Sequence, residues 1–300
     1  MIHGLVLVNK SKNITSHTVV ERIRTLFKTK KAGHFGTLDP LAEGLLLIGM
    51  GNATKFFNFY MKKKKLYSGK IRFGFATTTY DSEGSPLSEK KETDLSQADI
   101  PALLARFTGK QMQIPPIYSA KKLNGKPLYK YARNNQEVEV KPVEIEIFSL
   151  KGKVLDNETL GFEALTSSGT YIRSLAHDIG QMVGSGAYLH ELKREGVGEF
   201  YLKDAFTLEE LERHVADSDI SRVVTPIEAL LPEFSKIIVN PGGRQGILNG
   251  MHLMPRDILK VISTENKENF RLFDDEGKLL AIARKDERLM RFKPYIVFPD

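Results

Sequence analysis

Residues 31–45 read Lys31-Ala-Gly-His-Phe-Gly-Thr-Leu-Asp-Pro-Leu-Ala-Glu-Gly-Leu45. The stretch is too rich in glycine to form a helix and lies between two apolar segments, so it predicts a shaped loop. It carries one aspartate, Asp39, with basic residues upstream and Pro40 fixing the backbone behind it. A carboxylate held in a rigid, otherwise cationic loop is a candidate nucleophile or base. The alternative for a lone Asp-Pro pair is an ordinary turn residue.

The composition predicts a soluble protein with a substantial core. The chain has 300 residues, of which 41% are hydrophobic, enough for two domains or for one large domain with an appendage. Cysteine is absent, which excludes disulfides, thiolate chemistry and cysteine-ligated zinc. We find neither a signal peptide nor an apolar run long enough to span a membrane. We therefore expect a cytoplasmic protein without membrane association.

Positive charge is concentrated near the start of the chain. Residues 1–70 contain 13 Lys and Arg against Glu21, Asp39 and Glu43, a net charge of +10 in a chain whose total is +7. This asymmetry indicates a polyanionic partner, with nucleic acid the leading candidate. The alternative for the Lys62–Lys65 run is a solvated surface.

Two further segments carry candidate site residues. Apolar residues recur at helical spacing after Tyr171, which predicts a helix with Arg173 near its start and one step from the buried face. Residues 65–75 alternate between polar and apolar, which predicts a strand whose apolar face begins with Tyr67. Taken alone, Arg173 fits a surface arginine and Tyr67 fits a core tyrosine.

The string Gly33-His-x-Gly-Thr-Leu-Asp-Pro-x-Ala-x-Gly-Leu45 resembles the active-site loop of the TruB family, the synthases that make pseudouridine in the tRNA T-loop. Gly74-x-x-Thr77-x-Thr79-x-Asp81-x-x-Gly84 and Gly169-Thr-Tyr-Ile-Arg173 are also similar to motifs of that family. Lys10, Thr15 and Ser16 match its N-terminal motif. Ser11 and Asn13 replace the Pro and Gly of that motif, which predicts a looser turn.

The resemblance implies an α+β fold. Residues 1–232 are expected to form the pseudouridine-synthase domain, a mixed, largely antiparallel sheet with flanking helices and a central cleft. Residues 233–300 are expected to form a small PUA-like RNA-binding β-barrel. Short strand patterns support the second expectation, at residues 237–239, 270–273, 279–283 and 295–298.

Pseudouridylation breaks the bond from ribose C1′ to uracil N1 and remakes it to C5, so no metal or cofactor is expected. It requires an ionised carboxylate, a dry pocket and a flipped-out base. The resemblance implies that Asp39 is the catalytic carboxylate, that Arg173 pairs with it and that Asp81 holds Arg173 from its other side. Whether Asp39 attacks C1′ or C6, or deprotonates C2′, stays open. The remaining implied roles are base stacking and proton transfer at C5 by Tyr67 and pocket walls from Tyr171 and Leu192. His34 is expected to contact the RNA or to help hold the flipped base, and Lys10 to bind the substrate.

Three other functions fit the sequence less well. A guide-dependent rRNA synthase of the same superfamily is disfavoured by the length of the chain and by the lack of a long basic tail. An RNA-binding module with relic catalytic residues is disfavoured because the matched chemical positions are intact. A phosphoryl-transfer enzyme would need a glycine-rich phosphate loop or a metal cluster, and neither pattern occurs. We therefore expect a monomeric enzyme that acts on the T-arm stem-loop of tRNA without an obligate protein partner.

Overall fold

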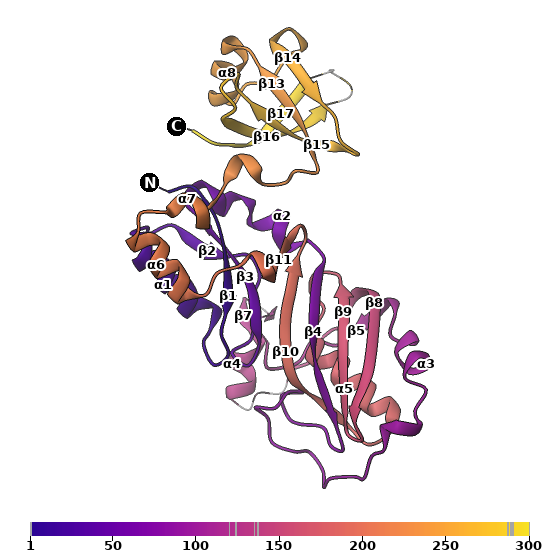
Figure 1. Cartoon of the computed structure of the whole chain (residues 1–300). Helices are drawn as coiled ribbons and strands as arrows, with labels where there is room; N and C mark the ends of the chain where they lie inside the picture. Colours follow the sequence, from indigo (N-terminus) through magenta and orange to yellow (C-terminus); the bar gives the residue numbers. More distant parts are fainter. Residues whose placement is uncertain are drawn as a thin grey trace.

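Two sheets make up the framework of the protein, one large and one small (Figure 1). The computed structural model describes residues 2–119, 121–123, 125–134, 136, 138–286, 288 and 291–299. The small sheet is built from the last part of the chain and lies above one end of the large sheet in the view of Figure 1.

The large sheet has ten strands and is mostly antiparallel. Only β10 and β3, among its described strands, pair in parallel, at Lys193 with Glu43 and at Arg194 with Gly44. This confirms the expected mixed, antiparallel-dominated sheet. Its main path is β12 (Thr225–Pro226), β1 (Gly4–Lys10), β3 (Glu43–Met50), β10 (Ala187–Val197), β4 (Lys65–Phe73), β9 (Thr159–Thr166), β8 (Val143–Asp156) and β5 (Gly109–Gln113), with β2 (Ala32–His34) on β3 and β11 (Phe200–Tyr201) on β10.

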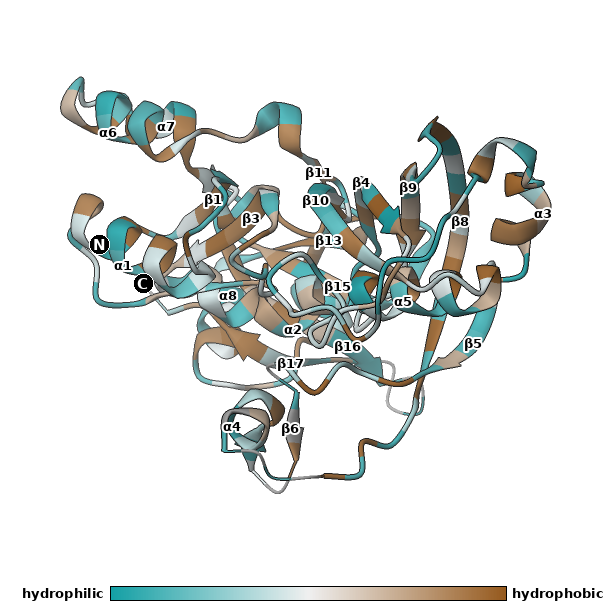
Figure 2. Ribbon diagram, turned by 90° about the horizontal axis from the view of Figure 1, so that it is seen from below, coloured by the Kyte–Doolittle hydropathy of each residue, from teal (hydrophilic) through white to brown (hydrophobic). Residues whose placement is uncertain are grey.

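Helices on one face of this sheet begin and end at residues that cap them. The helix α1 (Ser16–Leu26) begins after Thr15, whose side chain accepts a hydrogen bond from the amide of Thr18. The helix α5 (Ile172–Val183), expected from its apolar spacing, buries its apolar stripe and ends at Gly184 in the left-handed conformation. A capping box formed by Thr207 and Glu210 opens α6 (Leu208–Ala216). Figure 2 shows hydrophobic residues along the inner strands and mixed faces on α1 and α6.

The remaining elements are short. The helix α3 (Ile100–Ala105) packs on β8. Residues 122–133 contribute a small hairpin and one short helix. These elements are β6 (Lys122–Leu123), β7 (Lys126–Pro127) and α4 (Leu128–Arg133). Another short helix, α7 (Ile220–Val223), follows α6.

An aromatic core joins the two sheets. After β3, the chain forms a 3₁₀ helix (Gly51–Phe56) and then α2 (Phe57–Met61). Phe56 is fully buried and stacks on Phe298 from the C-terminal part, with 5.2 Å between ring centroids. Phe59 meets Phe234 edge to face. These rings therefore serve mainly as core between the two sheets.

The small sheet is open in the described part of the chain. Its order is β14 (Ile258–Ile262), β13 (Phe234–Val239), β15 (Asn266–Phe273), β16 (Leu279–Asp286) and β17 (Arg291–Val297), with α8 (Pro241–Leu248) beside it. The four strands expected from the sequence are present, and β14 is additional. An isolated antiparallel bridge joins Leu253 to Phe292 of the edge strand β17. A closed barrel is therefore not confirmed.

No helix within the described residues combines the length and the apolar character that crossing a membrane requires.

Replacing Phe56 tests the aromatic core. Phe56→Ala should lower the free energy of unfolding by about 3 kcal/mol, because it removes a fully buried ring and leaves a cavity. Phe57→Ala is the matched control on the neighbouring residue, whose side chain is 42% exposed, and should cost less than about 1 kcal/mol. Urea unfolding of both variants measures the difference; equal losses would contradict the assignment.

Candidate active site

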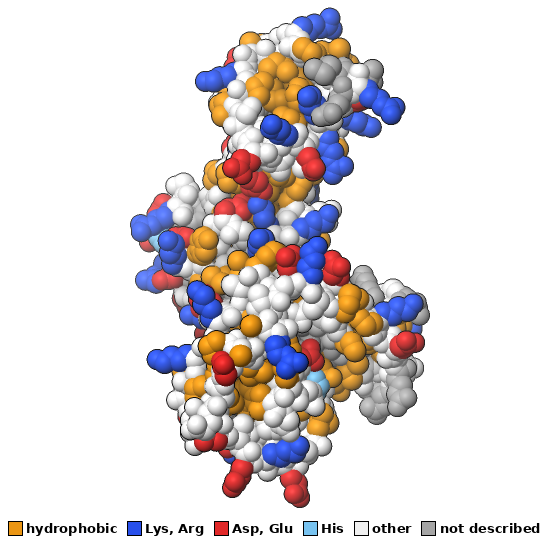
Figure 3. All heavy atoms as spheres, turned by 90° about the vertical axis from the view of Figure 1, so that its right-hand side faces the viewer, with side chains coloured by type: hydrophobic (Ala, Val, Ile, Leu, Met, Phe, Trp, Pro, Cys, Tyr) orange, Lys and Arg blue, Asp and Glu red, His pale blue; other side chains and the backbone are white. Residues whose placement is uncertain are grey.

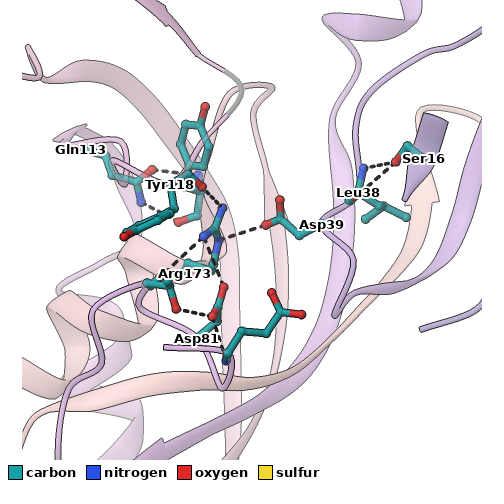
Figure 4. Close-up of polar contacts among 10 residues, drawn as sticks. Ser16, Leu38, Asp39, Asp81, Gln113, Tyr118 and Arg173 are labelled. Atoms are coloured by element: carbon teal, nitrogen blue, oxygen red, sulfur yellow. Dashed lines mark hydrogen bonds and ion pairs between the residues drawn. The ribbon is translucent and has the colours of Figure 1, made fainter. Parts of the chain in front are cut away.

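The guanidinium of Arg173 is the centre of the site (Figure 4). Its Nε lies 2.9 Å from Oδ2 of Asp39, and its Nη1 lies 3.2 Å from Oδ2 of Asp81. Nη1 also donates to the carbonyl of Thr79 at 3.2 Å, and Nη2 donates to the carbonyl of Tyr118 at 2.8 Å. One cation therefore connects four segments that are far apart in the sequence.

Backbone contacts hold both ends of the Asp39–Arg173 pair. The hydroxyl of Ser16, at the start of α1, donates to the carbonyl of Leu38 and accepts from its amide, at 2.9 and 2.8 Å. Gln113, at the end of β5, hydrogen-bonds both the amide and the carbonyl of Tyr171, the residue before α5. The two ionic groups are thus carried by segments that the neighbouring elements fix.

The Asp39 carboxylate is packed on most sides yet opens onto a cavity, since 36% of its side chain is exposed. Burial raises the pKa of Asp39 above its ordinary value. The positive charge of Arg173 lowers this pKa, the negative charge of Asp81 raises it, and Lys10 lowers it again. Arg173 is the strongest influence that favours the ionised form.

Most of the expected site residues line one cavity of about 560 Å³. Asp39 and Arg173 lie on its wall together with Tyr67, Tyr171 and Leu192. Tyr67 from β4 and Leu192 from β10 are each only 7% exposed, as the alternation of the two strands predicts. Burial also raises the pKa of Tyr171, so its hydroxyl stays protonated. The sequence thus predicted five residues that the fold brings together.

Lys10 lies behind the loop that carries Asp39 rather than in the cavity. Its side chain is buried, and Nζ donates to the carbonyls of Ser11, Ile14 and Pro40 at 3.0, 2.9 and 3.4 Å. Burial lowers the pKa of Lys10 to about 8, although the charge of Asp39 opposes this shift. This placement favours support of the Asp39 loop over direct contact with a substrate.

His34 also lies away from the residues that line the cavity. It ends β2, pairs with Ile48 of β3 and is partly buried. Burial, aided by the charge of Arg194, lowers the pKa of His34, so the ring is neutral near pH 7. Among the described residues, its Nδ1 has no hydrogen-bond partner.

Asn13 occupies the place where the family motif has glycine. It adopts a left-handed conformation with φ of 66°, which asparagine tolerates better than most residues. Its amide donates to the carbonyl of Pro40 at 2.8 Å. The departure from the motif therefore still lets this turn dock against the Asp39 loop.

Arg194 is a site residue to which the sequence reasoning gave no role. It is 1% exposed and donates to three carbonyls around the Asp39 loop: those of Leu45 at 2.7 Å, Gly36 at 3.1 Å and Thr37 at 3.3 Å. No ion pair of Arg194 with a carboxylate is seen in the described chain. The signal available in the sequence was its spacing: Arg194 lies two residues after the buried Leu192, so a cation falls on the apolar face of β10.

The left-handed turn at Gly44 explains how Arg194 comes so close. The φ of Gly44 is 103°, and a Cβ there would lie 2.5 Å from the carbonyl oxygen of Arg194. Glycine is therefore required where β3 and β10 run in parallel.

Within the described part of the chain, no three His, Asp or Glu side chains are grouped so that they could hold a metal ion.

Sequence comparison finds one family along most of the chain. Residues 24–172 match the TruB family pseudouridylate synthase N-terminal domain, and residues 173–232 match the tRNA pseudouridylate synthase B C-terminal domain. A protein of Solibacter usitatus named tRNA pseudouridine synthase B is 42% identical over 82% of this chain and 84% of its own. Proteins of the same name from Cupriavidus metallidurans and Thermotoga maritima are 38% and 36% identical, over 97% and 95% of this chain and 93% and 91% of their own.

Solved structures share the fold at low sequence identity. Cbf5 in an archaeal box H/ACA sRNP Nop10–Cbf5 complex superposes with a TM-score of 0.74 at 21% identity, covering 99% of this chain and 86% of that one. A chain of an H/ACA RNP bound to a substrate RNA containing 2′-deoxyuridine gives a TM-score of 0.75 at 20% identity, with the same coverage. These likenesses establish the fold.

The ion pair predicts how Asp39 titrates. Its carboxyl should protonate above the ordinary aspartate pKa of 3.8, because burial disfavours the charged form. Arg173→Met should raise the midpoint further, because it removes the largest influence that lowers this pKa. Carbon-13 NMR of the labelled carboxyl groups, with Asp39→Asn to assign the signal, measures both. A midpoint at or below 3.8, or one that falls in Arg173→Met, would contradict this picture.

Arg194 should carry a large share of stability. Arg194→Met removes the donor to the carbonyls of Leu45, Gly36 and Thr37 and should cost about 3 kcal/mol of unfolding free energy. The control Arg22→Met changes an exposed arginine of α1 and should cost less than about 0.5 kcal/mol. Urea unfolding compares the two variants, and similar small losses would show that the Arg194 contacts matter little.

Proposed function

This chain belongs to the TruB family of pseudouridylate synthases, and we propose that it isomerises uridine 55 in the T-loop of tRNA to pseudouridine. The observation that carries the proposal is the single cavity shared by Asp39, Arg173, Tyr67, Tyr171 and Leu192. A carboxylate that opens into a walled, mostly apolar cavity suits a reaction that needs one negative charge and little water.

The chemistry follows from the contents of that cavity. The target nucleotide is flipped out of the T-loop, and its uracil enters beside Tyr67, whose ring offsets part of the unstacking cost. Ionised Asp39 acts on the ribose or the base, and the bond from C1′ to N1 breaks with its electron pair staying on the uracil. The uracil turns within the cavity and C5 bonds to C1′, while Asp39 gives back the bond or the proton that it took. C5 then loses its proton, and N1 gains one. We propose that the Tyr67 hydroxyl relays this proton, releasing its own as it accepts the one from C5.

Arg173 and Asp81 prepare Asp39 for this step. Arg173 favours the ionised carboxylate and fixes its direction through a charge-assisted contact. Asp81 faces Arg173 from the other side, accepts from it and prevents it from turning away. We infer that Asp81 is a positioning residue, because its carboxylate is nearly closed off from solvent.

The other assigned residues act around the base. Tyr171 and Leu192 form walls of the cavity and exclude water from the reacting bond. His34 is assigned a contact with the RNA outside the cavity. Lys10 is assigned to support of the Asp39 loop from behind, through the carbonyl of Pro40.

We further propose a division of labour between residues 1–232, as the catalytic domain, and residues 233–300, as an RNA-binding module of PUA type. The compact C-terminal sheet with α8 supports this division. Figure 3 shows Lys and Arg side chains spread over this part of the surface, as suits contact with a polyanion. The enzyme is proposed to act as a monomer in the cytoplasm, without a guide RNA or protein partner.

Incubation with an unmodified tRNA transcript tests the proposed function. Mapping at single-nucleotide resolution should find pseudouridine at position 55 with the pure protein alone. A bare T-arm stem-loop should also be modified, and a stem-loop whose target uridine is replaced by cytidine should not. Modification that requires a guide RNA or a protein partner would favour the alternative class, and modification elsewhere would overturn the proposed substrate.

Asp39→Asn should abolish turnover. The amide keeps the size of the side chain but removes the charge, and with it the ability to act as nucleophile or base, so single-turnover rates should fall by more than about a thousandfold. The affinity for tRNA, measured by filter retention, should stay within about tenfold of that of the parent protein, because the basic residues on the protein surface are unchanged. Substantial residual turnover would remove Asp39 from the catalytic role.

A further inference from the structure

A stacked pair of rings lies next to the catalytic network but outside the cavity. The rings of Tyr80 and His177 are 3.9 Å apart between centroids and are inclined by 19°. Tyr80 directly precedes Asp81, and His177 lies one turn after Arg173 on α5. Neither ring lines the cavity that holds Asp39. The stack therefore joins the two segments that carry Asp81 and Arg173.

Tyr80 has an unusual backbone conformation. Its φ is +62°, in the left-handed region that a bulky residue adopts only at a cost in free energy. The residues on either side of it both reach the same nitrogen: the carbonyl of Thr79 and Oδ2 of Asp81 each lie 3.2 Å from Nη1 of Arg173. The left-handed residue is what brings a backbone carbonyl and the next side chain to one point.

Other contacts attach this turn to the sheet. The amide of Leu189, in β10, donates to the carbonyl of Tyr80 at 3.0 Å, and the amide of Ser82 donates to the carbonyl of Leu189 at 3.1 Å. The hydroxyl of Thr77 closes the turn by donating to the carbonyl of Asp81 at 2.7 Å. These bonds fix the turn relative to β10. Its distance from α5 is set by Arg173 and by the ring stack.

The His177 ring is held by packing. In the described chain its Nδ1 has no hydrogen-bond partner, and the ring is partly buried against Tyr80. Burial lowers the pKa of His177, so the neutral ring is present near pH 7 and stacks without the cost of burying a charge. The stack on Tyr80 is therefore the contact that holds the His177 ring in place.

We propose that Tyr80 and His177 are positioning residues, which form a clasp that holds Thr79 and Asp81 against Arg173 and thereby sets the position of Asp39. The kinetic part of this inference rests on the proposed isomerisation of uridine. Its structural part, the effect of the clasp on Arg173, does not.

The test compares Tyr80→Gly with Tyr80→Phe. Glycine removes the ring and relieves the left-handed backbone, so this variant should fold with an unfolding midpoint at or near that of the parent protein. Its kcat should nevertheless fall by about 10- to 100-fold, with KM within about threefold, because Arg173 is misplaced while RNA binding is intact. Tyr80→Phe keeps the stack and should stay within about twofold of the parent.

His177→Ala tests the other half of the clasp at a partly buried position of α5, where alanine favours the helix. Its kcat should fall as in Tyr80→Gly. The double variant should be no slower than either single variant, because both changes remove one contact. Fully multiplicative losses would overturn the clasp.

A second readout separates failure of the clasp from failure of the proposed function. The Nε–H signal of Arg173 in nitrogen-15 NMR, assigned with Arg173→Lys, reports the environment of the guanidinium without any substrate. It should shift or broaden in Tyr80→Gly and His177→Ala and should be unchanged in Tyr80→Phe. If the parent protein does not modify tRNA, the proposed function fails while this measurement still judges the clasp. An unmoved Arg173 signal, or a kcat in Tyr80→Gly equal to that of the parent, would overturn the inference.

Discussion

A single buried guanidinium between two carboxylates is the interaction on which the site depends. Arg173 contacts Asp39 and Asp81 and also donates hydrogen bonds to the carbonyls of Thr79 and Tyr118. In a poorly solvated setting two carboxylates repel each other and resist ionisation, and a cation without acceptors is equally costly. The fold therefore has to bring the Asp39 loop, the turn at Asp81, the segment at Tyr118 and the start of α5 together at one place.

Hydrogen bonds from neighbouring elements hold the loop that carries Asp39 in place. Ser16 holds Leu38 through two hydrogen bonds, Lys10 supports Pro40, and Arg194 donates to the carbonyls of Gly36 and Thr37. The carboxylate is thus directed toward the cavity before any substrate binds. Prearranged charge and position are major sources of catalytic rate, because nothing has to reorganise at the moment of reaction.

The sequence predicted the local parts of this site better than the long-range ones. Strand alternation placed Tyr67 at the start of an apolar face, and helical spacing placed Arg173 beside a buried stripe. The motif resemblance then paired Arg173 with Asp39 and Asp81. Periodicity does not report contacts between distant segments. It therefore could not predict which carbonyls accept hydrogen bonds from Arg194 and Lys10, or that Tyr80 stacks on His177. For the same reason the short C-terminal strand patterns did not determine whether the small sheet closes.

The central claim is that the guanidinium fork of Arg173, and not merely its charge, keeps Asp39 ionised and aimed. Single-turnover conversion of a T-arm stem-loop by Arg173→Lys tests it most directly, since lysine retains the charge but cannot contact both carboxylates and two carbonyls at once. The account predicts a rate at least about tenfold below that of the parent protein, with RNA affinity unchanged within about threefold. A rate equal to that of the parent would contradict it.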